Sequence, residues 1–150
     1  MKNNTDLAEQ ILKGTRKAKH LMKNIMEGFD HESVYEGLNS THFRTLMVLE
    51  ARGNLCMKDI CHLLGIEAGS FTPVADRLMK EGLIQRLPDP HDRRKTLLSP
   101  TDWGEEFTVR LKEKIGEHMR KRLSLLSEEQ SFRFREALKV IEEVSDLLEG

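Results

Sequence analysis

The segment that decides the fold spans residues 56–98 and reads CMKDICHLLGIEAGSFTPVADRLMKEGLIQRLPDPHDRRKTLL. In residues 57–64 the apolar side chains recur at the spacing of one helical face, which predicts a short helix. Gly65 interrupts this pattern in the way that a helix-ending residue with positive φ does. A second helix is predicted after it, ending at Gly82. The apolar side of this second helix consists of Phe71, Val74, Ala75 and Leu78.

Two short apolar segments follow, residues 83–87 and 95–98, on either side of the polar stretch PDPHDRR at 88–94. Such segments around a turn-forming stretch predict a β-hairpin, here with a basic tip. Two short helices joined by a tight glycine turn and followed by a hairpin are typical of a winged helix-turn-helix. Such a unit places its second helix in the major groove of DNA. We therefore expect residues 38–99 to form a DNA-binding unit of this kind.

Amphipathic helices are predicted on both sides of this unit. Residues 5–29 have apolar side chains at three-and-four spacing. Their polar side is basic, and we interpret it as a solvated face; it carries Lys13, Arg16, Lys17, Lys19 and Lys23. Asn39 or Ser40 is expected to cap a helix that runs to about Arg52. Thr101 is expected to cap a further helix, and the capping box SEEQ at 127–130 predicts the start of another.

The apolar stripes of the flanking helices are longer than so small a core can cover. We therefore expect residues 5–29 and 104–149 to be dimerisation helices that pair two copies of the chain about a two-fold axis. Residues 1–150 are predicted to form a single domain. Its predicted fold class is mainly α with a small β-hairpin wing, a winged helix-turn-helix flanked by long dimerisation helices.

Composition narrows the possible functions. The formal net charge is −1, from 24 basic and 25 acidic residues, so any interaction with nucleic acid must come from local clustering. Residues 68–95 show such clustering, with six basic side chains against four acidic ones. Aromatic residues make up only 5% of the chain, which argues against a base-stacking platform for single strands. With no apolar run of about 18 residues, no signal peptide and two cysteines, the chain is expected to be cytoplasmic, with no membrane contact.

Three motifs resemble those of a known family. DRLMKEGLI at 76–84, PDPHDRR at 88–94 and TDWG at 101–104 are similar to the pattern of the MarR family of bacterial transcription regulators. The resemblance covers about residues 38–107, and the flanking helices agree in kind and length. It implies a homodimeric winged-helix protein, usually a repressor, that binds a pseudo-palindromic operator. In many members it also implies release from DNA by a small phenolic or aromatic effector.

Two segments depart from the family pattern. GSFTP at 69–73 is similar to the start of the recognition helix in the organic-hydroperoxide-sensing branch, which senses through a cysteine in its first helix. The first cysteine here is Cys56, so sensing by that route is not expected. Ser99-Pro100 replaces the usual Ser-Leu, which is expected to alter the start of the next helix without removing it.

The second helix of the helix-turn-helix offers the candidate DNA contacts. With its apolar residues turned inward, the outer side is expected to present Ser70, Thr72, Pro73, Asp76 and Arg77. Because Pro73 has no N–H and suits only the first turn of a helix, the helix should begin near Ser70. The two hydroxyls can donate to phosphates or base edges, and Arg77 can bind a guanine or a phosphate. Asp76 is expected to accept from a cytosine amino group or to orient Arg77. Plain solvent exposure is the alternative for each.

The hairpin tip supplies the other candidate contacts, Asp92, Arg93 and Arg94. Two guanidinium groups at a hairpin tip suit a narrow minor groove, where the negative potential is enhanced. The resemblance implies that Asp92 and Arg94 form a pair that sets the wing. Either Arg93 or Arg94 would then enter the groove.

An effector pocket, if the resemblance extends that far, is expected where the dimerisation helices meet the winged core. Its candidate residues are Arg16, His20, Tyr35, His42, Trp103 and Phe107. Packing and solvent exposure account for each of them equally well.

The sequence also offers candidates for other kinds of function. Cys56 at a helix N-terminus is a candidate redox-sensing thiol, either in a regulator or in a redox protein, although a partly buried inert thiol is the simpler interpretation. Metal-ligand spacings such as CxxC or HExxH are missing, and so are the catalytic and nucleotide-binding motifs GxSxG and GxGxxG. We therefore predict no enzyme activity, no metal and no cofactor. A winged helix used only to bind other proteins is the remaining alternative.

Overall fold

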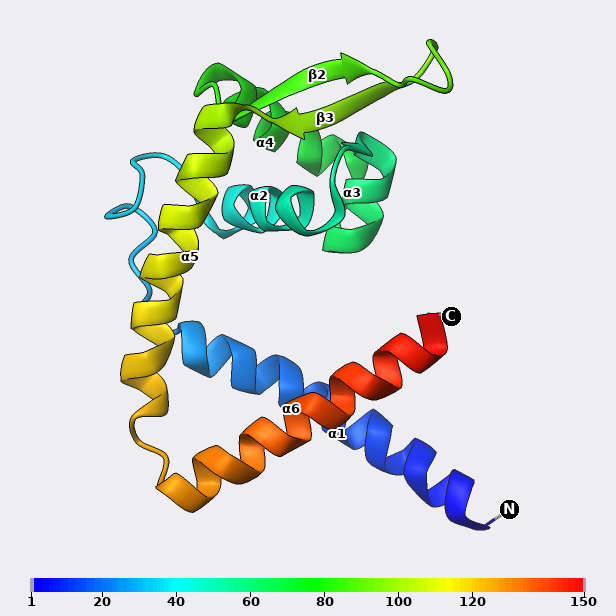
Figure 1. The fold of residues 1–150 in the computed structure, drawn as a ribbon, viewed down its shortest axis with the longest axis vertical. Coiled ribbons are helices and arrows are strands. Elements are labelled where there is room, and N and C mark those ends of the chain that lie inside the picture. The colour runs from blue at the N-terminus through cyan, green and yellow to red at the C-terminus, as the bar shows by residue number, and fades with distance from the viewer. Residues whose placement is uncertain (1, 150) are drawn as a thin grey trace. The chain divides into compact units, whose positions relative to one another are not determined.

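The computed structural model describes the backbone of residues 2–149 and the side chains of residues 6–148. Its elements, shown in Figure 1, are α1 (Lys2–Met26), α2 (Ser40–Arg52), β1 (Leu55–Cys56), α3 (Met57–Leu64), α4 (Ala68–Lys80), β2 (Ile84–Pro88), β3 (Thr96–Pro100), α5 (Asp102–Leu123) and α6 (Glu128–Glu149). The predicted fold class, mainly α with a small β-hairpin wing in a winged helix-turn-helix, is confirmed. None of the described helices combines the length and the apolar character needed to cross a membrane.

The described residues divide into two compact units. Residues 30–115, here called the winged unit, contain α2, α3, α4, the three strands and the first part of α5. Residues 2–29 and 116–149, here called the helical unit, contain α1, the end of α5 and α6.

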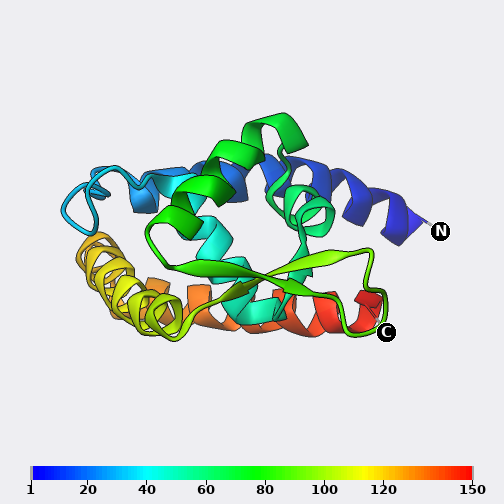
Figure 2. The same ribbon diagram turned by 90° about the horizontal axis from the view of Figure 1, so that it is seen from above.

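The winged unit is built on one apolar core beneath a small antiparallel sheet. The strand order is β1-β3-β2, and β2 pairs with β3 from Ile84↔Pro100 to Pro88↔Thr96. Figure 2 shows the two long strands twisting as they run from the end of α4 toward the wing tip. The largest fully buried side chains of the unit are Phe71, Leu38, Leu46, Leu49, Ile60, Leu78, Leu83, Leu98 and Leu111.

The sequence-based helices of this unit are largely confirmed. Asn39 caps α2 by accepting from the backbone N–H groups of Thr41 and His42, at 3.0 and 3.4 Å. Gly65 ends α3 in the left-handed region, with φ 67°. At the end of α4, Gly82 has φ 69°, and the N–H of Leu83 returns to the Leu78 carbonyl at 3.0 Å. This return bond is the mark of a glycine-ended helix, and it turns the chain directly into β2.

The strand predictions needed correction at the ends. β2 begins at Ile84, and β3 runs to Pro100, two residues beyond the expected end. A third strand, β1, pairs Leu55 with Leu98 and Cys56 with Leu97, and it was not predicted. A two-residue strand has too short a pattern to show alternation, and its backbone pairs with residues more than forty positions away.

The start of α5 is fastened to the turn between α4 and β2. The Thr101 Oγ1 accepts from the N–H of Gly104 at 3.0 Å, which confirms Thr101 as the N-cap, and it donates to the Gly82 carbonyl. The Thr101 N–H donates to the Leu83 carbonyl at 3.1 Å. These bonds join the wing, the end of α4 and the start of α5 into one rigid corner.

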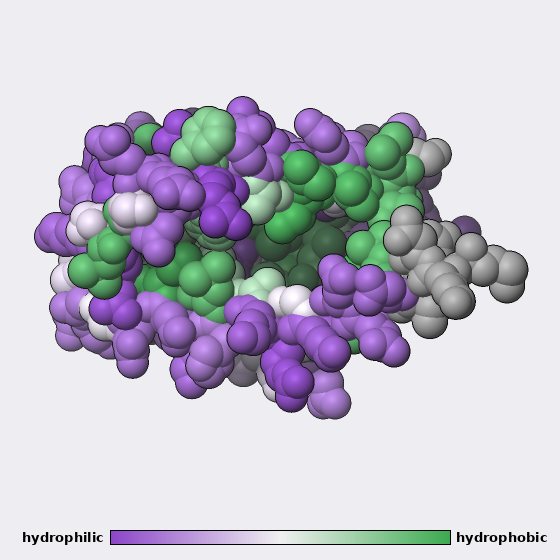
Figure 3. Space-filling model, turned by 90° about the horizontal axis from the view of Figure 1, so that it is seen from below, coloured by the Kyte–Doolittle hydropathy of each residue, from purple (hydrophilic) through white to green (hydrophobic). Residues whose placement is uncertain are grey.

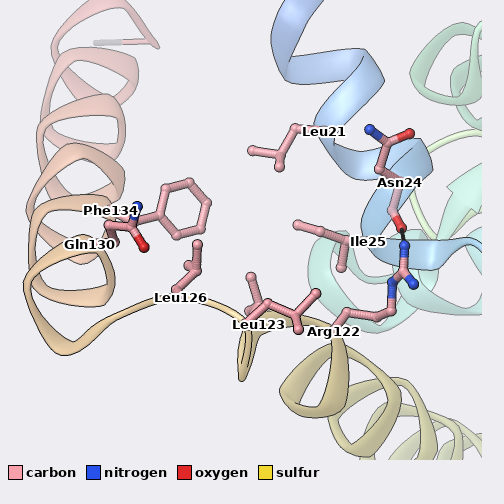
Figure 4. Close-up of a pocket in the computed structure, with 9 residues that line it drawn as sticks. Leu21, Asn24, Ile25, Arg122, Leu123, Leu126, Gln130 and Phe134 are labelled. Carbon is pink, nitrogen blue, oxygen red and sulfur yellow. Dashed lines mark hydrogen bonds between the residues drawn. The ribbon is translucent and has the colours of Figure 1, made fainter.

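The helical unit has an apolar hollow of about 300 Å³ between α1, the end of α5 and the start of α6. Figure 4 shows Leu21, Ile25, Leu123, Leu126 and Phe134 pointing into it. At its edge, the Arg122 guanidinium donates to the Asn24 carbonyl at 3.0 Å. The capping box at the start of α6 is confirmed, because the N–H of Ser127 donates to Gln130 and the N–H of Gln130 donates back to Ser127. α1 ends at Met26 rather than at Phe29.

Candidate nucleic-acid interface

The outer side of α4 is the first part of the candidate interface. Phe71, Ala75 and Leu78 are fully buried and fix the rotation of this helix against the core. Four of the five residues expected on the outer side are exposed: Ser70, Thr72, Pro73 and Asp76. The Thr72 hydroxyl donates to the Ala68 carbonyl at 3.1 Å, so its oxygen faces outward mainly as an acceptor.

The start of α4 differs from the expectation. The helix begins at Ala68 rather than near Ser70, so Pro73 lies inside it, beyond the first turn. The N–H groups of Ser70 and Phe71 both donate to the Glu67 carbonyl, at 3.0 and 3.1 Å, and this starts the helix earlier. Because Pro73 has no N–H for the carbonyl four residues before it, the Gly69 carbonyl lacks its usual helical donor. That oxygen belongs to the exposed N-terminal part of α4.

The two charged residues of α4 have different surroundings from those expected. Asp76 lies beside Arg86 of β2, with 4.0 Å between the carboxylate oxygen and the guanidinium nitrogen, so its ion pair is with Arg86 rather than with Arg77. Arg77 is half-buried rather than free on the outer side. Its Nη2 lies 3.0 Å from the Glu81 carboxylate and donates to the Glu36 carbonyl at 3.4 Å.

The wing tip is the second part of the candidate interface, and its acidic residues shape it. The Asp89 carboxylate accepts from the backbone N–H groups of His91 and Asp92, at 2.8 and 3.3 Å. The bond from the His91 N–H is the main reason why the pKa of Asp89 lies below its usual range. The N–H of Lys95 closes the loop by donating to the Asp92 carbonyl at 2.8 Å. The tip is therefore a defined turn.

This turn presents the wing arginines to solvent. The Asp92 carboxylate accepts from the backbone N–H of Arg94 at 3.1 Å and lies 4.0 Å from its side chain. The pairing of these two residues thus lies mainly in the backbone, and the Arg94 side chain is 97% exposed. Arg93 is exposed as well. Both guanidinium groups extend from a loop whose backbone is held by acceptors within it.

The candidate effector residues fall in different places. Tyr35, Trp103 and Phe107 lie together in the winged unit, with ring centroids 5.6 Å apart for Tyr35–Phe107 and 6.0 Å for Trp103–Phe107. His42 is buried in the same unit. Arg16 and His20 belong to the helical unit, on the exposed side of α1, where they line a shallow hollow with Lys19 and Lys23. Within the winged unit, the structure brings together the three aromatic residues of the set.

His42 has a structural role that spacing alone did not indicate. Its Nδ1 lies 3.1 Å from the backbone nitrogen of Asn39, which donates to it, so histidine completes a capping box at the start of α2. Burial lowers the pKa of His42, and the positive charge of Arg77 lowers it further. The neutral ring is therefore the form that the fold favours.

Neither cysteine is in a disulfide. Cys56 is the N-cap of α3, but its thiol makes no capping bond and donates to the Asp59 carboxylate at 3.0 Å. Cys61 is buried, and burial raises its pKa. Across the described part of the chain, no three His, Cys, Asp or Glu side chains are grouped in a way that could hold a metal ion.

Two residues of this region were missed by the sequence analysis. Glu81 binds Arg77 from the C-terminal end of α4, and the i,i+4 spacing of this opposite-charge pair was a readable signal. Arg86, the neighbour of Asp76, comes from β2, and only the sheet brings it alongside α4.

Known proteins resemble this chain in both sequence and structure. The model of the MarR family matches residues 38–96. The uncharacterised HTH-type transcriptional regulator YkoM of Bacillus subtilis strain 168 is 30% identical over 104 residues, which cover 69% of this chain and 68% of YkoM. The crystal structure of a probable transcriptional regulator from Pseudomonas aeruginosa is 27% identical, with a TM-score of 0.62 and coverage of 90% of this chain and 98% of that one.

A further solved structure shares the fold. The PcaV transcriptional regulator from Streptomyces coelicolor, crystallised in complex with its natural ligand, is 24% identical with a TM-score of 0.57, and the match covers 90% of this chain and 91% of PcaV. Together with the helix-turn-helix and the basic wing described above, these findings establish the relationship. The chain belongs to the MarR family of transcriptional regulators.

Proposed function

We propose that this protein binds a pseudo-palindromic operator in double-stranded DNA as a homodimer and represses transcription until a small aromatic ligand releases it. In each protomer, α4 would enter the major groove and the wing would follow the adjacent minor groove. The protein would then act in the bacterial cytoplasm, on the chromosome.

The observation that carries this proposal is the pairing of two exposed surfaces on one rigid unit. The polar outer side of α4 and the arginine tip of the wing both belong to the winged unit. The bonds of Thr101 join the wing base to the end of α4. Two surfaces fixed to one corner can contact neighbouring grooves without first being ordered, which lowers the entropic cost of binding.

The residues of this surface have distinct proposed roles. Ser70 would contact phosphates or base edges, Thr72 would accept from a donor on a base edge, and Pro73 would bring the N-terminal part of α4 close to the DNA backbone. Asp76, held beside Arg86, would accept from a cytosine amino group. Arg93 and Arg94 would reach into the minor groove, with Asp92 setting the loop.

Dimerisation is supported by the apolar surface of the helical unit. Large apolar side chains of α1 and α6 are exposed, among them Leu12 at 76%, Ile141 at 64% and Leu148 at 83%. On the face drawn in Figure 3, hydrophobic side chains gather in a hollow bordered by hydrophilic ones. Exposed apolar surface of this extent marks an interaction site. A second copy of the chain is the proposed occupant, since an operator of two half-sites requires a two-fold protein.

The ligand is proposed from the aromatic residues of the winged unit. Tyr35, Trp103 and Phe107 form edge-to-face contacts, and Trp103 is 38% exposed. Such a cluster suits a flat aromatic molecule. The natural ligand bound to PcaV, a protein of the same fold, agrees with release by a small molecule.

Fluorescence anisotropy with DNA fragments that the wild-type protein recovers from genomic DNA would test the proposal. We expect nanomolar binding at roughly physiological salt, with an affinity for unrelated duplexes lower by about a thousandfold or more. Equal affinity for every duplex would contradict sequence-specific recognition of an operator. The absence of binding even in dilute buffer would contradict a DNA-binding function. Quenching of Trp103, the only tryptophan, would report binding of aromatic ligands.

A further inference from the structure

Arg77, in the last turns of the helix proposed to enter the major groove, is held by two neighbours, Glu81 and Glu36. Its Nη2 lies 3.0 Å from one carboxylate oxygen of Glu81 and donates to the Glu36 carbonyl at 3.4 Å. The other carboxylate oxygen of Glu81 accepts from the Tyr35 hydroxyl at 2.6 Å. Both oxygens of Glu81 are therefore engaged, one by the recognition helix and one by the linker before α2.

The linker is shaped to receive this side chain. Gly37 has φ 76°, and a Cβ at this position would lie 2.8 Å from the Arg77 Nη2. The Tyr35 ring is held edge-on by Phe107 of α5, which directs its hydroxyl toward Glu81. A hollow of about 460 Å³ remains among these residues. The linker therefore forms a site that accommodates the Arg77 guanidinium.

Among the described residues, this site leaves one hydrogen-bond donor of the guanidinium without a partner. The Nε of Arg77 is buried, and no hydrogen-bond partner is found for it within the described structure. A buried donor without an acceptor costs free energy, so the unpaired N–H destabilises this position of the Arg77 side chain. A guanidinium that moved out to a phosphate could donate in the bidentate fashion that it prefers.

The Arg77 guanidinium pairs with the Glu81 carboxylate, and a DNA phosphate would compete with that carboxylate for it. We propose that Glu81 and Tyr35 form a latch that withholds Arg77 from DNA, so that Glu81 weakens operator binding and opening the latch adds one cation per protomer to the interface. This inference depends on the proposed function, because it assigns a regulatory contact to the same DNA-binding surface.

A structural role for Glu81 is the competing explanation. Glu81 is the C-cap residue of α4, and an i,i+4 pair with Arg77 adds support to any helix. Under that explanation, removing the charge of Glu81 would lower stability and leave DNA binding the same or weaker. Under the latch, the same substitution tightens binding. The two explanations therefore differ in the sign of the effect on affinity.

The experiment compares Glu81→Gln and Tyr35→Phe with the wild type by anisotropy, using recovered operator DNA over a series of NaCl concentrations. We expect Glu81→Gln to bind roughly threefold to tenfold tighter at about 0.1 M salt. We also expect the slope of log K against log[salt] to steepen by about one per protomer. Tyr35→Phe should act in the same direction but less, because it removes one of the two partners of Glu81. It is also the milder change should Glu81→Gln impair folding.

Glu36→Gln is the matched control. It removes a carboxylate from a residue next to the Arg77 site. The Glu36 side chain is exposed, and the hydrogen bond of Arg77 is to the backbone carbonyl of this residue. If the loss of any negative charge raises the affinity for DNA, the affinity of Glu36→Gln will rise as well. A gain confined to Glu81→Gln and Tyr35→Phe assigns the effect to the latch.

Arg77→Ala completes the test in both backgrounds. In the wild type it should change affinity less than twofold, whereas in Glu81→Gln it should abolish the gain. The latch is overturned if Glu81→Gln binds no tighter than Glu36→Gln, or if the gain survives in the double variant. If the wild-type protein binds no duplex at all, the proposed function is wrong. If the wild type and the variants bind the operator equally, only the latch is wrong.

Discussion

The α-carbon of Gly104 packs against the backbone carbonyl of Leu83 so closely that a β-carbon at residue 104 would overlap that oxygen. Gly104 lies in the first turn of α5, and Leu83 lies in the turn between α4 and β2. This contact, together with the bonds of Thr101, sets the position of α5 on the winged unit. Neither partner can yield easily, because one is a helix backbone and the other is the carbonyl that accepts from Thr101.

Gly104→Ala should therefore lower the free energy of unfolding by about 1–3 kcal/mol, as overpacking does. Urea denaturation followed by circular dichroism would measure the change. Gly69→Ala is the matched control, because a Cβ there meets nothing within 4 Å, and it should be neutral or slightly stabilising. Equal stabilities of the two variants would show that α5 can shift away from Leu83 at little cost.

Replacing both wing arginines, Arg93→Ala with Arg94→Ala, should weaken operator binding and flatten its salt dependence by roughly one to two units per protomer. The reason is that both side chains are exposed on a loop held by its own backbone bonds, so the substitutions remove cations without removing structure. Lys114→Ala with Lys121→Ala removes the same charge from exposed positions of α5 outside the proposed interface. If both double variants lose affinity equally, net charge rather than the wing explains binding.

Ile141→Asp should shift the protein from dimer to monomer and weaken operator binding, because it places a charge on the apolar surface proposed for the second copy. Light scattering coupled to size-exclusion chromatography would give the mass. Val109→Asp, at a position 57% exposed in the winged unit, serves as the control and should leave the mass unchanged. A dimer that tolerates Ile141→Asp would place the interface elsewhere.

Acid should destabilise the winged unit through His42. Burial, with a smaller contribution from Arg77, lowers the pKa of His42 in the folded chain. A group whose folded pKa is lowered favours the folded state above its unfolded pKa, which is about 6.5 for histidine, and this contribution is lost as the pH falls below that value. Protonation also removes the acceptor for the Asn39 N–H.

The melting temperature measured between about pH 8 and pH 5 would show this loss. His42→Gln keeps a side-chain acceptor at the same position of the capping box but does not titrate, so its melting temperature should fall less over the same range. An identical fall in the variant and the wild type would assign the acid sensitivity to other groups.

Much of the fold follows from local patterns in the chain. The helix boundaries at Gly65, Gly82 and Thr101 were predicted, and Asn39 was one of the two predicted caps of α2, because caps and glycine stops depend on residues within one turn of each other. The hairpin and its exposed arginines follow from the same local rules. These features identify the surface that would meet DNA.

Other features were decided only by the tertiary structure, because they depend on contacts between residues far apart in the sequence. Arg77 is turned toward Glu36 and Gly37, about forty positions earlier, as well as toward Glu81 of its own helix, and the helical pattern alone did not indicate the two distant contacts. The strand β1 exists because β3 lies beside it, and Gly104 is required because Leu83 passes close to it. Helical spacing shows which side of an element is apolar, but only packing determines which partners the polar side meets.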